Sequence, residues 1–308
     1  MRKETTPAYS MEAEDNLGTT LKPPKKPKMA NGETDISCGK ISYVQSNGKG
    51  RPIVYIHHNS GSKEVFLKQL KGLGEEYNII ALDLPGHGKS SDPYNPEETY
   101  SFPGYAKVVI EFTEKLGLSG TKIVFCGVSL GGHLAIEVLH QRPDLVAGLL
   151  ITGAPPIPLT EEGIAKGFKP CEVAEMMSQE NKFTEKQATK FSTIGIDPEE
   201  VPFLVKAGMR TDGLSRSYMV QSIKKGTGAN QKEVVEQSPK PIGIICGAHD
   251  EGVNNEYIEK EVQYNENLFR ILTLDSGHGC HWLSAKEFNE FTREFMEFIG
   301  SQKKELSI

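Results

Sequence analysis

The sequence predicts an α/β fold: a mostly parallel sheet with helices on both faces and a helical cap inserted between two of the strands. Short apolar runs alternate with helical stretches along most of the chain, which is typical of βα units. The runs are continuously apolar, as expected of strands that are buried on both faces. Residues 155–238 interrupt this alternation without a convincing strand and predict the cap.

Composition narrows the class of protein. The chain has 308 residues and a formal net charge of −6, which fits one large α/β domain with an insertion and disfavours a nucleic-acid-binding role. No apolar run approaches the roughly 18 residues that span a bilayer. Because the N-terminus lacks the apolar stretch of a secretory signal and the five cysteines form no CxxC pair, we expect a cytoplasmic protein with reduced thiols. Nothing in the sequence predicts an oligomeric state.

Three regions follow from the pattern. Residues 1–33 are poor in apolar side chains and contain a Lys/Pro-rich run, so we expect a disordered tail. Residues 34–154 and 239–308 carry the strand and helix signals of the α/β core. Residues 155–238 read as several short helices and form the predicted cap.

The core elements are predicted in chain order. Strands are expected at the apolar runs 41–44, 53–56, 78–82, 123–126, 149–151, 242–245 and 269–274. Helices are expected at 103–116, where Pro103 suits the first turn, at 130–141, which ends before Pro143, and at 285–299. The aromatic stripe of this last helix should dock it on the sheet.

A candidate nucleophile lies between strand 123–126 and helix 130–141. The segment Gly127-Val128-Ser129-Leu130-Gly131 is a G-x-S-x-G motif in the strand–turn–helix context that supports it. A sharp turn exposes the serine hydroxyl and requires small neighbours, and the new helix directs free N–H groups toward a developing oxyanion. The motif therefore predicts Ser129 as the nucleophile of a hydrolase.

A serine nucleophile needs a base and a group that orients the base. Asp250 follows strand 242–245 and His278 follows strand 269–274, in the chain order serine, acid, histidine. Both lie at carboxyl ends of strands, where open α/β sheets place their sites. Glu251 and His281 are their direct competitors, and we prefer His278 because its flanking glycines leave it free to reach the serine.

The remaining parts of the site are predicted from loops. The oxyanion hole requires two backbone N–H groups, for which we nominate Leu130 and Asn59, the latter in the loop 57–62 after an early strand. A phosphate-binding P-loop, a G-x-G-x-x-G after a strand and an H-E-x-x-H motif are all absent from the sequence. The sequence therefore predicts no metal and no cofactor.

These motifs resemble those of the α/β-hydrolase superfamily, with matching segments at 57–60, 83–90, 127–131, 247–250 and 277–278. Segments at 151–156, 167–169, 210–213 and 226–231 make the chain most similar to the α/β-hydrolase type of N-acyl-homoserine lactonase. The resemblance implies a cap after strand six, the triad Ser129, Asp250 and His278, and an oxyanion hole from Asn59 and Leu130. His58 departs from the usual glycine, and Leu130 stands where an aromatic residue is frequent.

The expected activity is cleavage of a carboxylic ester or lactone through an acyl-serine intermediate, and the resemblance extends it to N-acyl-homoserine lactones. The partner is then a small-molecule ester or lactone. The alternative is a non-catalytic or slow small-molecule receptor on the same fold. If the cap covers Ser129, adaptable apolar side chains should line an acyl pocket. The candidate wall residues are Phe168, Met176, Met177, Phe203 and Met209.

Overall fold

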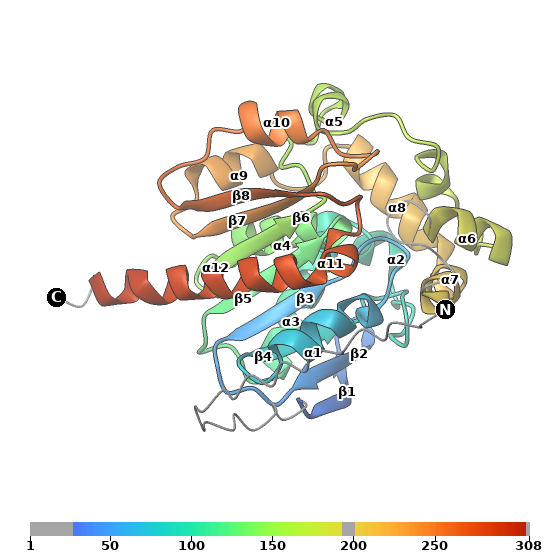
Figure 1. The fold of residues 1–308 in the computed structure, drawn as a ribbon. Coiled ribbons are helices and arrows are strands. Elements are labelled where there is room, and N and C mark those ends of the chain that lie inside the picture. The colour runs from blue at the N-terminus through green and yellow to red at the C-terminus, as the bar shows by residue number, and fades with distance from the viewer. Residues whose placement is uncertain (1–26, 193–200, 306–308) are drawn as a thin grey trace, which may run out of the picture.

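The structure, a computed structural model, describes residues 27–192 and 201–305. Its centre is an eight-stranded sheet with the order β1-β2-β4-β3-β5-β6-β7-β8 (Figure 1). The strands are β1 (Met29–Ile36), β2 (Gly39–Ser46), β3 (Pro52–Ile56), β4 (Asn78–Leu82), β5 (Ile123–Val128), β6 (Val146–Thr152), β7 (Ile242–Gly247) and β8 (Leu268–Leu274). β3 to β8 pair in parallel, and β2 is antiparallel to both of its neighbours. The mostly parallel sheet is thereby confirmed.

One boundary differs from the sequence prediction. Residues 29–33, expected in the disordered tail, form the first part of β1, which pairs with β2 from Met29 opposite Ser46 to Ile36 opposite Gly39. β1 is an edge strand with mostly exposed side chains, so it needs no apolar run to form. Backbone pairing in a hairpin with β2 holds it in place, and composition does not report that pairing. Residues 1–26 of the expected tail lie outside the described residues.

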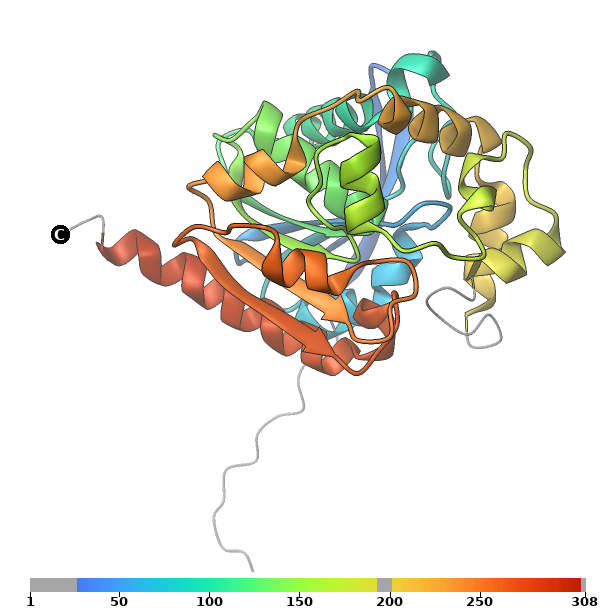
Figure 2. The ribbon, with the colours of Figure 1, turned by 90° about the horizontal axis from the view of Figure 1, so that it is seen from above.

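Helices cover both faces of the sheet, as Figure 2 shows from above. α3 (Phe102–Lys115) and α4 (Leu130–Gln141) pack together on one face, whereas α1 (Leu67–Leu73) and α12 (Ala285–Glu305) pack together on the other. The short helices η1 (Lys63–Phe66), α2 (Pro96–Thr99), α10 (Asn255–Lys260) and α11 (Cys280–Leu283) complete the core. The three helices expected in the core are confirmed, with ends shifted by a few residues.

Alternate residues of the central strands enter two separate hydrophobic cores. Val54 and Ile56 of β3 belong to the core under α3 and α4, whereas Ile53 and Tyr55 belong to the core under α12. This double burial explains why the strand runs are continuously apolar. The predicted aromatic stripe of α12 is buried against the sheet, with its members Phe288, Phe291, Phe295 and Ile299.

The segment between β6 and β7 is helical, as expected. Its described part contains α5 (Glu161–Gly167), η2 (Glu175–Ser178), α6 (Glu185–Ser192), α7 (Pro202–Arg210), α8 (Gly213–Lys224) and α9 (Gln231–Gln237). Side chains of Thr160, Asp212 and Asn230 cap α5, α8 and α9 by accepting backbone N–H groups. α6, α7 and α8 gather beside the carboxyl ends of the central strands (Figure 1). Among the described residues, no helix is both long and apolar enough to cross a bilayer.

Candidate active site

Ser129 lies on a strained turn between β5 and α4. Its φ of 53° falls in the left-handed region, where a residue other than glycine is strained. A Cβ on Gly127 would come within 2.0 Å of the Gly131 carbonyl oxygen, and one on Gly131 within 2.0 Å of the Ile56 carbonyl oxygen. The turn is therefore so tight that both flanking positions of the motif require glycine.

Asp250 and His278 form a directly bonded pair at the ends of β7 and β8. The Nδ1 atom of His278 lies 2.6 Å from the Asp250 Oδ2 atom. The other carboxylate oxygen accepts the backbone N–H groups of Gly252 at 2.9 Å and Val253 at 3.0 Å. Because an ionised carboxylate only accepts, Nδ1 carries the proton and Nε2 of the neutral ring has a free lone pair. His278 is thereby prepared to take a proton from another group.

The electrostatics keep Asp250 ionised. Burial by itself would raise the pKa of this carboxyl, but the hydrogen bond and charge of His278, together with the N–H groups of Gly252 and Val253, outweigh burial and hold the pKa below its ordinary value. The competing residues have other surroundings. Glu251 is exposed, and His281 is fully buried with no partner for either ring nitrogen among the described residues.

Ser129 and His278 line the same cavity, which has a volume of about 290 Å³. Gly153, just after β6, has a φ of 63°, and a Cβ there would come within 2.8 Å of the His278 ring. The absence of a side chain at Gly153 thus leaves room for the His278 imidazole. The Ser129 hydroxyl makes no hydrogen bond with the described residues, which leaves it available to a substrate and to His278; such bonds often tighten only when substrate binds.

Asn59 and Leu130 follow β3 and β5, which are neighbouring parallel strands with Ile56 opposite Gly127. Both residues line the cavity. Leu130 is the first residue of α4, so its N–H has no partner within the helix. Asn59 is 8% exposed, and its side-chain N–H₂ has no partner among the described residues. The cavity that Ser129 lines therefore has free N–H donors at Asn59 and Leu130.

A buried arginine fixes the loop that contains Asn59. The Arg216 guanidinium, from α8, donates to the Ser60 hydroxyl at 3.2 Å and to the carbonyls of Gln179 and Asn181. It also lies 3.7 Å above the Phe183 ring. Ser60 has a φ of 57°, so this clamp holds a second strained residue next to the site. The inserted segment is in this way tied to the loop after β3.

The walls of the cavity are mainly apolar. The core contributes Phe102, Val128 and Leu130. The inserted segment contributes Ile157, Leu159, Ile164, Phe168, Cys171, Ala174, Met177, Phe191, Leu204, Met219 and Ile223. A serine hydroxyl and a neutral base at one end of such a cavity suit attack on the carbonyl of a substrate with an apolar chain. Among the described residues, no group of three or more His, Cys, Asp and Glu side chains is arranged to hold a metal ion.

Comparison with known proteins identifies the family of the chain. Residues 51–285 match the family model of the alpha/beta hydrolase fold. The chain belongs to the alpha/beta hydrolase fold family. Two solved structures of N-acyl homoserine lactonase AidH, one a mutant complexed with N-hexanoyl homoserine and the other complexed with N-butanoyl homoserine, are each 32% identical with a TM-score of 0.82. They cover 88% of this chain and 98% and 97% of their own chains.

Curated relatives of this hydrolase differ in their reactions. Esterase Rv0045c of Mycobacterium tuberculosis is 28% identical over 85% of this chain and 88% of its own length. The sn-1-specific diacylglycerol lipase ABHD11 of Xenopus laevis is 26% identical over 85% of this chain and 84% of its own length. Family membership therefore establishes a hydrolase and leaves the substrate to be argued from the site.

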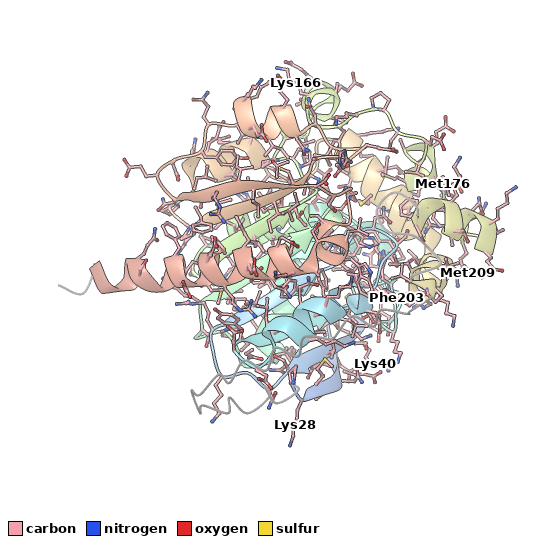
Figure 3. All side chains as sticks on the ribbon, in the orientation of Figure 1. Lys28, Lys40, Lys166, Met176, Phe203 and Met209 are labelled. Atoms are coloured by element: carbon pink, nitrogen blue, oxygen red, sulfur yellow. The ribbon has the colours of Figure 1, made fainter. Side chains whose placement is uncertain are left out.

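The five candidate wall residues of the hydrolase divide into two groups. Phe168 and Met177 line the cavity. Met176 is buried instead in the small core of the inserted segment, Phe203 packs on Trp282 with ring centroids 5.4 Å apart, and Met209 is 39% exposed (Figure 3). For these three residues the prediction was wrong, because residue type does not say which side of a short helix faces the site.

Other residues that line the cavity were not among the candidates predicted from the sequence. Met219 and Ile223 both line it, and their spacing of four places them on one face of α8. His133 also lines it, one helical turn after Ser129 on α4. The sequence shows the helical spacing of these residues, but only the packing of α4 and α8 decides which face of each helix lines the cavity.

Burial of histidines predicts how the stability of this hydrolase depends on pH. Burial lowers the pKa values of His57, His87, His133 and His281, that of His133 from 6.5 to about 4. Below pH 6.5 the unfolded chain takes up protons that the folded protein does not, so the free energy of unfolding falls as the pH falls from 6.5 toward 4. His133 alone should cost about 2 kcal/mol between pH 7 and pH 5.

The measurement is urea unfolding at pH 7, 6 and 5. His133→Phe should make the pH dependence of the free energy of unfolding shallower than in the wild type. A free energy of unfolding that stays constant from pH 7 to 5 would contradict the prediction.

Proposed function

We propose that this protein hydrolyses a carboxylic ester or lactone through an acyl-serine intermediate on Ser129. One observation carries the proposal. A strained, unpartnered serine opens into the same apolar cavity as a histidine whose Nδ1 atom is held by a buried carboxylate 2.6 Å away. Nucleophile, base and orienting acid are the three parts that acyl transfer requires.

The reaction follows from these positions. His278 Nε2 takes the Ser129 proton as the hydroxyl attacks the substrate carbonyl carbon, and Asp250 stabilises the imidazolium that forms. The backbone N–H groups of Asn59 and Leu130 hold the oxyanion. His278 then returns the proton to the leaving oxygen, and a water molecule releases the acid by the reverse route. With a lactone, the leaving oxygen stays attached, so the product is a hydroxy acid.

N-acyl-homoserine lactones are the substrates we favour. The likeness to AidH extends through 88% of this chain, and the inserted segment supplies most of the apolar cavity wall. The apolar walls suit an acyl chain, and the donors near Ser129 suit its polar end. A linear ester of matched chain length would fit the same arrangement.

The dependence of the rate on acyl length tests this proposal. Each methylene buried in the cavity should add about 0.8 kcal/mol, which raises kcat/KM about fourfold until the cavity is full. We expect acyl lactones and p-nitrophenyl esters to share one optimum length. The measurement is kcat/KM for both series from butanoyl to dodecanoyl.

Two methionines provide a matched control. Met219→Trp should shorten the optimum because Met219 lines the cavity, whereas Met209→Trp should leave it unchanged because Met209 is exposed. A flat length profile would contradict the acyl cavity. Hydrolysis of esters without lactone opening would remove the lactonase assignment alone, and tight binding of lactones without turnover would indicate the receptor.

A further inference from the structure

His133 is a buried polar side chain in the cavity that the proposed reaction does not use. It is 5% exposed and lines the cavity. Its ring stacks on Phe102, with centroids 5.1 Å apart and planes 12° apart, and a second aromatic ring, Phe168, lies 5.8 Å away. A polar ring so enclosed is costly unless its nitrogen atoms find partners.

Gln231 provides a partner for one nitrogen only. The Gln231 Nε2 atom donates to the His133 backbone carbonyl at 3.2 Å, which turns the amide oxygen toward the ring. That oxygen lies 2.6 Å from His133 Nδ1. Since an amide oxygen can only accept, Nδ1 must carry the proton. Gln231 is itself fully buried at the start of α9, so the pair is held firmly.

The other nitrogen is therefore an acceptor. In the neutral ring with a proton on Nδ1, Nε2 carries a lone pair and cannot donate. It has no partner among the described residues. Burial and the nearby His278 also lower the pKa of His133 to about 4, so the ring stays neutral near pH 7.

The position of this acceptor relative to Ser129 follows from helix geometry. Four residues of α-helix rise about 6 Å, and side chains on a helix point back toward its N-terminus, here toward Ser129. Both side chains line the same cavity. A substrate group that reaches His133 is thus close to the carbonyl under attack.

We propose that His133 Nε2 accepts a hydrogen bond from an N–H or O–H group of the substrate, about two or three bonds from the carbonyl carbon that Ser129 attacks. Gln231 is the positioning residue that keeps Nε2 unprotonated. This inference rests on the proposed function, because it assumes that the acyl group enters the cavity. It selects substrates with an amide N–H or a hydroxyl near the reacting carbonyl over those with only acceptors there.

Two lactones that differ in one group test the inference. In N-hexanoyl-homoserine lactone the amide N–H is bonded to the α-carbon of the lactone ring, two bonds from the lactone carbonyl carbon. In its carba analogue a CH₂ of similar size replaces this N–H. We expect wild type to favour the N–H compound in kcat/KM by about tenfold, as one hydrogen bond would give. His133→Phe keeps the ring stack but lacks the acceptor, so the ratio should fall to about one.

Controls separate this inference from a folding defect. Should His133→Phe fail to fold because it leaves Gln231 unpaired, the double variant His133→Phe/Gln231→Leu removes both polar partners, a change that is often nearly neutral. Gln237→Leu, at the exposed end of the same helix α9, should keep the wild-type ratio. An equal preference for the N–H compound in wild type and in the folded His133 variant would overturn the inference.

Binding distinguishes failure of the inference from failure of the proposed function. Calorimetry with Ser129→Ala protein gives the Kd of each intact lactone without turnover. A tenfold tighter Kd for the N–H compound that disappears with His133→Phe supports the inference even if wild type opens neither lactone. Opening of both lactones at equal rates overturns the inference and leaves the lactonase proposal standing. Binding of neither lactone overturns the inference.

Discussion

Replacing Ser129 with alanine is expected to lower kcat by about 10³-fold or more while the protein stays folded. The hydroxyl makes no hydrogen bond with the described residues, so its loss removes the proposed nucleophile and little else. The remaining donors of Asn59 and Leu130 would still bind the substrate carbonyl, so KM should change much less than kcat. The measurement is steady-state hydrolysis of p-nitrophenyl esters, with folding checked by thermal unfolding.

A covalent probe gives a second measurement of the same point. A fluorophosphonate should label the wild type and fail to label Ser129→Ala. Exposed Ser178, in η2 of the inserted segment, provides a matched control, and Ser178→Ala should keep both labelling and turnover. Labelling that persists in Ser129→Ala would show that another residue is the nucleophile.

Asp250→Asn is expected to lower kcat by about 10³- to 10⁴-fold, although the side chain keeps its shape. The backbone N–H groups of Gly252 and Val253 donate to one oxygen of Asp250, so the amide oxygen of the new side chain must occupy that place. Its N–H₂ group then faces His278 Nδ1 and forces that atom to accept. The ring proton moves to Nε2, where it prevents His278 from taking the serine proton.

The neighbouring carboxylate is the control for this change. Glu251→Gln alters the charge of the same loop in the same way, but its side chain is exposed and should affect kcat by less than about threefold. Esterase kinetics on both variants decide the ranking. A larger loss in Glu251→Gln than in Asp250→Asn would mean that Asp250 does not orient the base.

Local signals predicted most of the α/β core. The buried strands are continuous apolar runs, and the strand–turn–helix around Ser129 needs glycine at positions 127 and 131 for reasons that lie within a few residues. β1 was missed because an exposed edge strand depends on pairing with β2 and has little pattern of its own. One local residue does mark this hairpin: Gly39, the first residue of β2, has a φ of 135°.

In the inserted segment, the helices were predicted from the sequence but most of the candidate wall residues were not placed correctly. Its helical character follows from its composition and capping residues, but three of the five candidate wall residues, Met176, Phe203 and Met209, face elsewhere. An apolar side chain on a short helix can pack in the core of the inserted segment or line the cavity. The packing of the helices over the sheet decides between the two, and periodicity within one helix does not contain that information.

The sequence by itself determined the order of the core elements and the identity of Ser129, Asp250 and His278 as candidates, because each follows a strand end and the ends of parallel strands share one edge. Only the tertiary structure decided between neighbours. It pairs His278 with Asp250 at 2.6 Å, buries His281 without partners and leaves Glu251 exposed. It also brought His133 and Gln231, 98 residues apart, into contact. Such choices depend on distances across the fold, which residue type and spacing along the chain do not specify.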